Sequence, residues 1–132
     1  TKYMEVEFFR YVMHLTSVVK GQLLPGLASI EALKATLPAG PVSGAPKIRA
    51  MKRIYEAEKE KWGVYAGAIG YLSVTGDLDF AIAIRTMILK NKKAYVQAGA
   101  GIVYDSIAEN EYQETVNKAK SMTRIGEEGW FY

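Results

Sequence analysis

The chain has 132 residues, a net charge of +3 at pH 7, 49% hydrophobic residues and no cysteine. This length fits one domain with enough apolar residues for a core, and the small charge gives no reason to expect nucleic-acid binding. The lack of cysteine excludes disulfides and thiolate chemistry and fits a cytoplasmic protein, and no apolar run is long enough to cross a membrane.

The chain opens with a predicted strand and a predicted helix. Residues 6–20 are rich in β-branched and aromatic residues, which favours a strand. His14 lies within this strand, where it either exchanges a proton near neutral pH or serves as a structural residue. Apolar residues at helical spacing then predict a helix over residues 28–37, with Ser29 as its N-cap.

A loop of glycine, proline and small residues follows at 39–46 and leads into a second predicted helix. Pro46 suits the first turn of that helix, and Gly63 is expected to end it. The helix carries a basic cluster, Lys47, Arg49, Lys52 and Arg53. Without an aromatic stacking platform, this cluster is interpreted as a solvated face and not as a nucleic-acid site. Lys47 is unusual, because a cation at a helix N-terminus opposes the helix dipole.

From Gly63 onward the apolar period changes to two, which predicts an antiparallel meander. The three predicted strands are residues 64–74, 78–89 and 93–104. Turns at 75–77 and 91–92 would join them. Ser106 and Glu109 then fit the capping box of a last helix. The expected fold class is therefore α+β, with helices packed against an antiparallel sheet.

Arg85 lies inside the second predicted strand, where a buried guanidinium needs a partner to replace its lost hydration. In the meander it would face about Ala66 on one side and about Ala98 on the other, so small side chains leave room above it. There a guanidinium can hold a carboxylate through two parallel hydrogen bonds. The alternative is an internal ion pair with Asp79, Asp105 or a helix glutamate.

The last predicted helix carries a second charged group. Glu111, Glu114 and Lys118 fall within about 60° of each other around a helix axis. Two carboxylates three residues apart can hold Mg²⁺, which keeps several waters and does not need a full protein cage. The alternative is a solvated helix face with a Glu114–Lys118 ion pair.

Six segments in this order resemble the C-terminal half of the catalytic domain of chorismate-utilising enzymes, and most closely the anthranilate-forming type. They are YVMHLTS (11–17), LPAGPVSGAPK (37–47), YAGAIGY (65–71), FAIAIRT (80–86), AGAGIVYDS (98–106) and EYQETVNKA (111–119). The resemblance implies a partial chorismate-binding domain over residues 1–132. It also implies tryptophan biosynthesis: chorismate and ammonia, the latter from a glutamine amidotransferase partner, would give anthranilate and pyruvate.

The resemblance further implies roles for individual residues. Arg85 would bind a chorismate carboxylate with the help of Tyr71. Backbone N–H groups around Gly99 and Gly101 would face a substrate carboxylate.

The remaining implied roles belong to the last helix and the first strand. Glu111 and Glu114 would be Mg²⁺ ligands, and Lys118 would approach the other carboxylate of the substrate. His14 would lie near the ring position where the hydroxyl leaves or pyruvate is eliminated.

Two features depart from the family pattern. Pro41 stands where the family usually has Thr or Ser, and a proline offers neither a hydroxyl nor an N–H. The resemblance covers only the C-terminal half of the family's domain, so the N-terminal half is expected to be absent and the isolated chain catalytically silent. The start at Thr1 without Met, close to an apolar stretch, also suggests a chain cut from something longer. The alternatives are a sister enzyme forming aminodeoxychorismate, isochorismate or salicylate, and a non-catalytic fragment that self-associates through an apolar edge.

Overall fold

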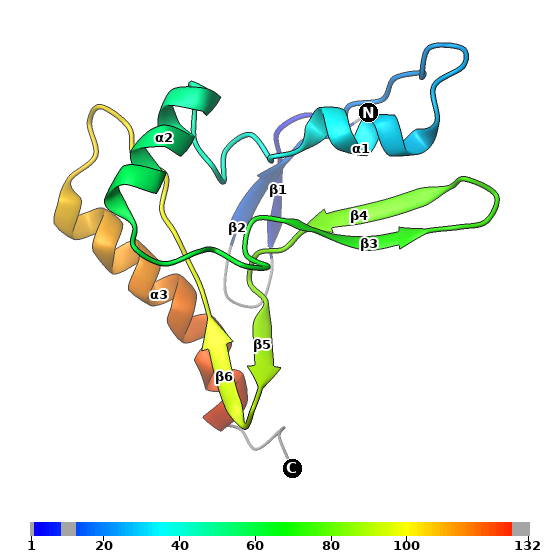
Figure 1. Cartoon of the computed structure of the whole chain (residues 1–132). Helices are drawn as coiled ribbons and strands as arrows, with labels where there is room; N and C mark the ends of the chain where they lie inside the picture. Colours follow the sequence, from blue (N-terminus) through cyan, green and yellow to red (C-terminus); the bar gives the residue numbers. More distant parts are fainter. Residues whose placement is uncertain (1, 9–12, 128–132) are drawn as a thin grey trace.

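The computed structural model describes residues 2–8 and 13–127, and within them it contains six short strands and three helices (Figure 1). The side chains of His14 and of residues 124–127 lie outside this description. The mixture of helices with antiparallel strands confirms the predicted α+β class. None of the helices in the described ranges is both long and apolar enough to span a membrane.

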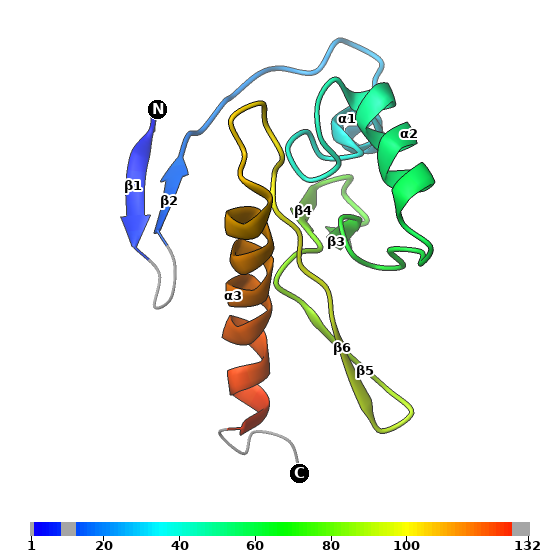
Figure 2. The same ribbon diagram turned by 90° about the vertical axis from the view of Figure 1, so that its left-hand side faces the viewer.

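The first predicted strand is wrong as a single strand, because the structure divides it into a hairpin. β1 (Glu5–Phe8) pairs antiparallel with β2 (Met13–Thr16), with Glu5 opposite Thr16. Each strand then satisfies the backbone hydrogen-bonding groups of the other, which one long unpaired strand cannot do. Figure 2 shows this hairpin standing apart from the other elements.

The first two helices are shorter than predicted. α1 (Ser29–Thr36) ends before Pro38, since a residue that precedes proline disfavours helical dihedrals. Ser29 is not its N-cap: Ala28 holds that position, and the Ser29 hydroxyl donates a hydrogen bond to the carbonyl of Gly76. α2 (Lys47–Ala57) begins directly after Pro46, which is the N-cap and not a first-turn residue.

The end of α2 also differs from the prediction, which placed it at Gly63. The helix ends at Ala57, and the Glu58 N–H still donates to the carbonyl of Ile54 at 2.8 Å. Trp62 then donates through Nε1 to the carboxylate of Glu58. Glu58 itself adopts extended dihedrals, with φ −95° and ψ 134°, and this is where the helical path ends.

The predicted three-stranded meander is wrong, because the structure forms two separate two-stranded ribbons. β3 (Ala68–Leu72) pairs with β4 (Leu78–Ile82), and β5 (Met87–Lys90) pairs with β6 (Lys93–Val96). Both predicted turns are confirmed. Asn91 and Lys92 have φ values of 53° and 60°, as a two-residue hairpin of type I′ requires.

Four residues, 83–86, separate the two ribbons. The β3–β4 ladder extends one step further, since Ala83 N donates to the Gly67 carbonyl at 2.8 Å. Arg85 then adopts a left-handed φ of 51°. Period-two patterning predicts extended residues but not a left-handed residue between them, so β4 and β5 run in different directions (Figure 1). Arg85 therefore lies at a bend, not in the middle of a sheet.

α3 (Ala108–Glu127) lies beside β6, as Figure 1 and Figure 2 both show. The predicted capping box between Ser106 and Glu109 is wrong. The Ser106 hydroxyl accepts the Val103 N–H at 3.0 Å and donates to Glu111 Oε1 at 2.7 Å. Glu109 and Glu111 still place negative charge in the first turn, where it interacts favourably with the helix dipole and stabilises α3.

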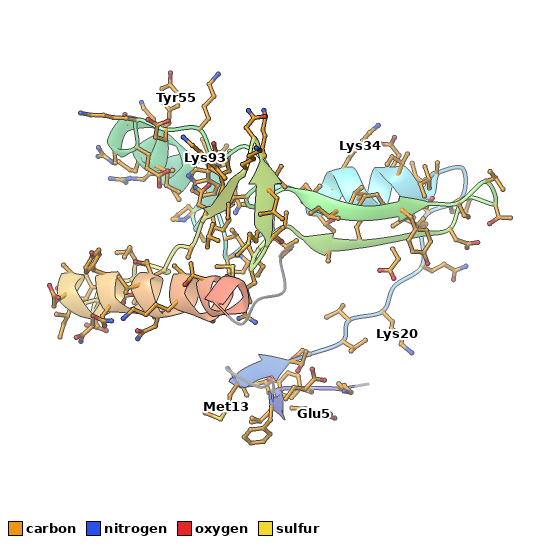
Figure 3. The ribbon with its side chains drawn as sticks, turned by 90° about the horizontal axis from the view of Figure 1, so that it is seen from below. Glu5, Met13, Lys20, Lys34, Tyr55 and Lys93 are labelled. Carbon is orange, nitrogen blue, oxygen red and sulfur yellow. The ribbon has the colours of Figure 1, made fainter. Side chains whose placement is uncertain are left out.

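The chain exposes far more surface than its size predicts. Its accessible area is 11470 Å², about two-thirds more than the roughly 6900 Å² expected of a compact protein of this length. Among the described residues, the buried ones are Ala39, Ser43, Ala83 and Met122. The side chains in Figure 3 accordingly project into open space around elements that spread apart. The expectation that this chain builds its own core is not met.

Candidate functional site

A cavity of about 930 Å³ lies where several parts of the chain meet, and Met13 of β2 is among the residues at its border. One wall is the loop between α1 and α2, through Pro41, Val42, Gly44 and Ala45. The C-terminal half of α2, the stretch 97–102 after β6, and α3 supply the other walls, and Arg85 borders the cavity from the bend between the ribbons. Segments from distant parts of the sequence thus enclose one hollow.

Five of the predicted site residues border this cavity. They are Arg85, Gly99, Gly101, Glu114 and Lys118. Lys118 Nζ donates to the Gly99 carbonyl at 3.2 Å and forms an ion pair with Glu114 Oε1 at 2.5 Å. The lysine therefore links α3 to the glycine-rich stretch, and the Glu114–Lys118 pair expected as the alternative interpretation is present.

Arg85, Glu114 and Lys118 also border a second, smaller hollow of about 400 Å³. The other residues that line it are polar and lie on α3: Asn110, Gln113, Asn117 and Ser121. Arg85, Glu114 and Lys118 therefore lie between two hollows. The larger one is lined in part by aromatic residues and glycines, and the smaller one is lined by polar residues of α3. This arrangement suits a ligand with an apolar ring and carboxylates.

Arg85 is held in a conformation that is costly for a side chain larger than glycine. Its φ of 51° lies in the left-handed region, which costs an L-residue about 1 kcal/mol or more. Arg85 interacts with another group of the protein, so it is not an isolated cation. The internal-partner and carboxylate-binding interpretations both remain compatible with this geometry.

Two predicted site residues, Tyr71 and Glu111, are not among the described residues that line the larger cavity. Tyr71 lies on β3 opposite Asp79, with 62% of its surface exposed. Glu111 lies on α3, where it accepts the Ser106 hydroxyl. His14 lies on β2, paired with Glu7, and its side chain is outside the described part.

The larger cavity also has an aromatic wall that the sequence pattern did not predict. Trp62 and Tyr65 meet edge to face, with ring centroids 5.2 Å apart and planes at 69°, and both border the larger cavity. A Cβ on Gly99 would lie 3.0 Å from the Tyr65 hydroxyl, so glycine gives that ring its room. The only signal in the sequence was two aromatic residues three apart ahead of β3.

Tyr65 provides a test of this wall by pH. Partial burial, followed by the negative charge of Glu58, raises the pKa of Tyr65 above 10.0. The folded state therefore holds this proton more tightly than the unfolded state, so stability falls as pH rises from about 10 through the higher folded pKa. The melting temperature should therefore fall between about pH 9 and about pH 11, a range that brackets the ordinary tyrosine pKa. We expect this fall to be smaller in Tyr65→Phe, which has no phenol proton to lose. Tyr104→Phe, at a fully exposed side chain, is the control, and an equal effect of both variants would contradict the prediction.

The carboxylates of α3 fit a divalent cation only in part. No group of three or more His, Cys, Asp or Glu is placed to hold a metal ion among the residues that the structure describes. Glu111 and Glu114 lie one turn apart on α3, and carboxylate oxygens are the donors that Mg²⁺ prefers. Since Mg²⁺ commonly keeps waters beside one or two carboxylates, this pair fits as a partial ligand set.

The chain matches the family described as chorismate binding enzyme over residues 1–124. This stretch is almost the whole chain, so the chain belongs to that family. This family is the one that the six segments indicated.

Individual relatives agree with this assignment. The chain is 63% identical to anthranilate synthase component 1 of Lactococcus lactis over 125 residues, covering 95% of this chain and 27% of that protein. It is 52% identical to anthranilate synthase component 1 of Aquifex aeolicus, covering 92% of this chain and 25% of that protein. It also resembles a crystal structure of anthranilate synthase component I from Streptococcus pneumoniae, with 85% identity and a TM-score of 0.89 over 94% of this chain and 28% of that chain. The chain thus spans about a quarter of the length of these relatives.

Proposed function

We propose that this chain forms part of the active site of an anthranilate synthase component I. The proposed reaction converts chorismate and ammonia to anthranilate, pyruvate and water. The observation that carries the proposal is the placement of Arg85, Lys118 and the glycine-rich stretch 98–101 around one cavity, in a chain whose similar proteins bear that name. That name also favours this reaction over those of the sister enzymes.

The chemistry of the substrate matches these groups. Chorismate carries two carboxylates, and a planar guanidinium holds a carboxylate through two parallel hydrogen bonds. We assign one carboxylate to Arg85 and to the backbone N–H groups near Gly99 and Gly101. Lys118, which borders both hollows, is assigned to the other carboxylate. The roles of Tyr71 and His14 rest on the resemblance alone.

Mg²⁺ is the proposed cofactor, and Glu111 and Glu114 would hold it on α3. When bound, it would offset the negative charge of a substrate carboxylate and act as a Lewis acid. The chain's own contribution is to position the substrate carboxylates and to give the ring a wall that includes Trp62 and Tyr65. Ammonia would come from a glutamine amidotransferase partner or from solution.

The reaction is tested in a chimera in which this chain replaces the matching stretch of the Streptococcus pneumoniae relative. The chimera is given chorismate, an ammonium salt and Mg²⁺, and the products are separated and identified. We expect anthranilate and pyruvate in equal amounts. Isochorismate, salicylate or aminodeoxychorismate in place of anthranilate would contradict the proposal.

The metal assignment is tested by Glu111→Gln and Glu114→Gln in the same chimera. Each variant removes one negative ligand, so we expect the Mg²⁺ concentration for half-maximal activity to rise by about 10- to 100-fold, the size of effect seen when metal-site partners are lost. Titration of activity with Mg²⁺ measures this change. Glu109→Gln, on the same helical turn and exposed, is the matched control. Unchanged Mg²⁺ dependence in both variants would remove these glutamates from the metal site.

A further inference from the structure

Lys47 is the basic residue whose position the sequence left unexplained. Its ammonium donates three hydrogen bonds, to the Ala39 carbonyl at 2.9 Å, to the Gly40 carbonyl at 2.6 Å and to Ser43 Oγ at 2.7 Å. A lysine ammonium has three N–H groups, so all of them are used. All three acceptors lie in the loop between α1 and α2.

This arrangement accounts for a cation in an unfavourable place. Lys47 is the first residue of α2, and the first turn of that helix carries no acidic residue. The helix dipole therefore opposes its charge. Three charge-assisted hydrogen bonds offset that cost, because each is stronger than one between neutral groups.

Ser43 connects the ammonium to the rest of the loop. It is 5% exposed, and its hydroxyl donates to the Ala39 carbonyl at 3.2 Å while it accepts from Lys47. The Ala39 carbonyl thus accepts from both side chains. A buried hydroxyl with both of these contacts fixes the loop more firmly than a solvent-exposed one would.

The network lies behind the wall of the larger cavity. The loop residues that line this cavity are Pro41, Val42, Gly44 and Ala45. The four residues of the network, Ala39, Gly40, Ser43 and Lys47, are not among the described residues that line it. Gly44 adds a second constraint, since a Cβ there would approach the Ala50 Cβ to 2.7 Å. One side of the loop therefore forms the wall while the other is held to α2.

We propose that Lys47 is a positioning residue that holds the loop 39–45 in place as a wall of the substrate cavity. At the cavity this loop presents Pro41, which has no hydroxyl and no N–H to donate to a substrate. The loop then acts through its shape, and its shape depends on the Lys47 contacts. The effect on substrate rests on the proposed function, whereas the effect on the loop does not.

Amide hydrogen exchange in the chimera tests the loop directly. Lys47→Met keeps the length of the side chain and removes all three hydrogen bonds. We expect exchange in residues 39–45 to become at least about tenfold faster, with exchange in β3 and β4 unchanged. Lys52→Met, at an exposed lysine of the same helix, is the control. Unchanged exchange in the loop would overturn the proposal, and so would a general increase that includes β3 and β4.

Two further measurements separate positioning from general stability. Ser43→Ala removes one of the three acceptors of Lys47, so it should speed loop exchange by less than Lys47→Met does. In the double variant it should add little, because Lys47→Met has already removed the contact between Lys47 and Ser43. Kinetics should show KM for chorismate raised about tenfold by Lys47→Met with a smaller change in kcat. Faster loop exchange with unchanged KM would overturn the substrate-wall role. Absence of turnover in the unsubstituted chimera would contradict the proposed function, and exchange would still decide the role of Lys47 in the loop.

Discussion

Arg85→Gly and Arg85→Ala are expected to lose chorismate turnover alike and to differ in stability. Both remove the guanidinium, and loss of a charge-assisted, two-point contact to a carboxylate should lower kcat/KM about 100-fold. The backbone responds differently, because Arg85 has a φ of 51°. Glycine tolerates this region while alanine does not, so Arg85→Gly should be more stable than Arg85→Ala by about 1 kcal/mol.

The control for this prediction is Lys92→Gly. Lys92 also has a left-handed φ, of 60°, but it lies in the β5–β6 turn and not at the cavity. The Lys92→Gly variant should therefore be more stable than the unsubstituted chimera and should show unchanged chorismate turnover. Chemical unfolding and anthranilate formation are measured for each variant in the chimera. Equal stability of the two Arg85 variants would show that the left-handed conformation is not retained, and unaltered turnover would favour the internal-partner interpretation.

The isolated 132-residue chain is expected to show no anthranilate formation and to associate with itself. The reason is its accessible area of 11470 Å², about two-thirds more than the roughly 6900 Å² of a compact protein of this length. Large apolar side chains are exposed on the hairpin (Phe8, Met13), on the β3–β4 ribbon (Ile69, Leu72) and after β6 (Tyr104). Exposed apolar side chains that gather into patches mark interaction surfaces, and in the isolated chain we expect a second copy to cover them.

Light scattering coupled to gel filtration, with chorismate and Mg²⁺ present in a parallel activity assay, measures both effects. Addition of the remaining part of the Streptococcus pneumoniae relative, produced separately, should convert the associated chain into a one-to-one complex that forms anthranilate. That remaining part alone is the control and should be inactive, since it lacks Arg85 and Lys118. A monomeric chain that melts cooperatively and does not bind the added part would contradict the prediction.

Local features of the sequence predicted the parts of the structure that depend on neighbouring residues. The turns near Gly76 and at 91–92 and the existence of α3 follow from short-range signals, and they are confirmed. The predicted group of Arg85, Gly99 and Lys118 also lies together at one cavity. That grouping came from the resemblance of ordered motifs, because spacing alone favoured a solvated helix face around Glu114 and Lys118.

Errors arose where the conformation of one residue changes the path of the chain. Arg85 is left-handed and breaks the meander, so β4 and β5 do not pair as one sheet. Glu58 is extended and ends α2 at Ala57, well before Gly63, where the helix was expected to end. Period-two or helical patterning reports which residues face a core, and it carries no information on such single conformations.

The sequence by itself therefore determined the α+β class and the family, and it supplied the charged groups proposed for the site, because these depend on residue types and their order. Only the tertiary structure decided which of those groups meet. It placed Tyr71 on an exposed strand, added Trp62 and Tyr65 to the cavity, and gave Lys47 its three acceptors. The physical reason is that contacts between loops depend on backbone direction over many residues, which local patterns do not encode.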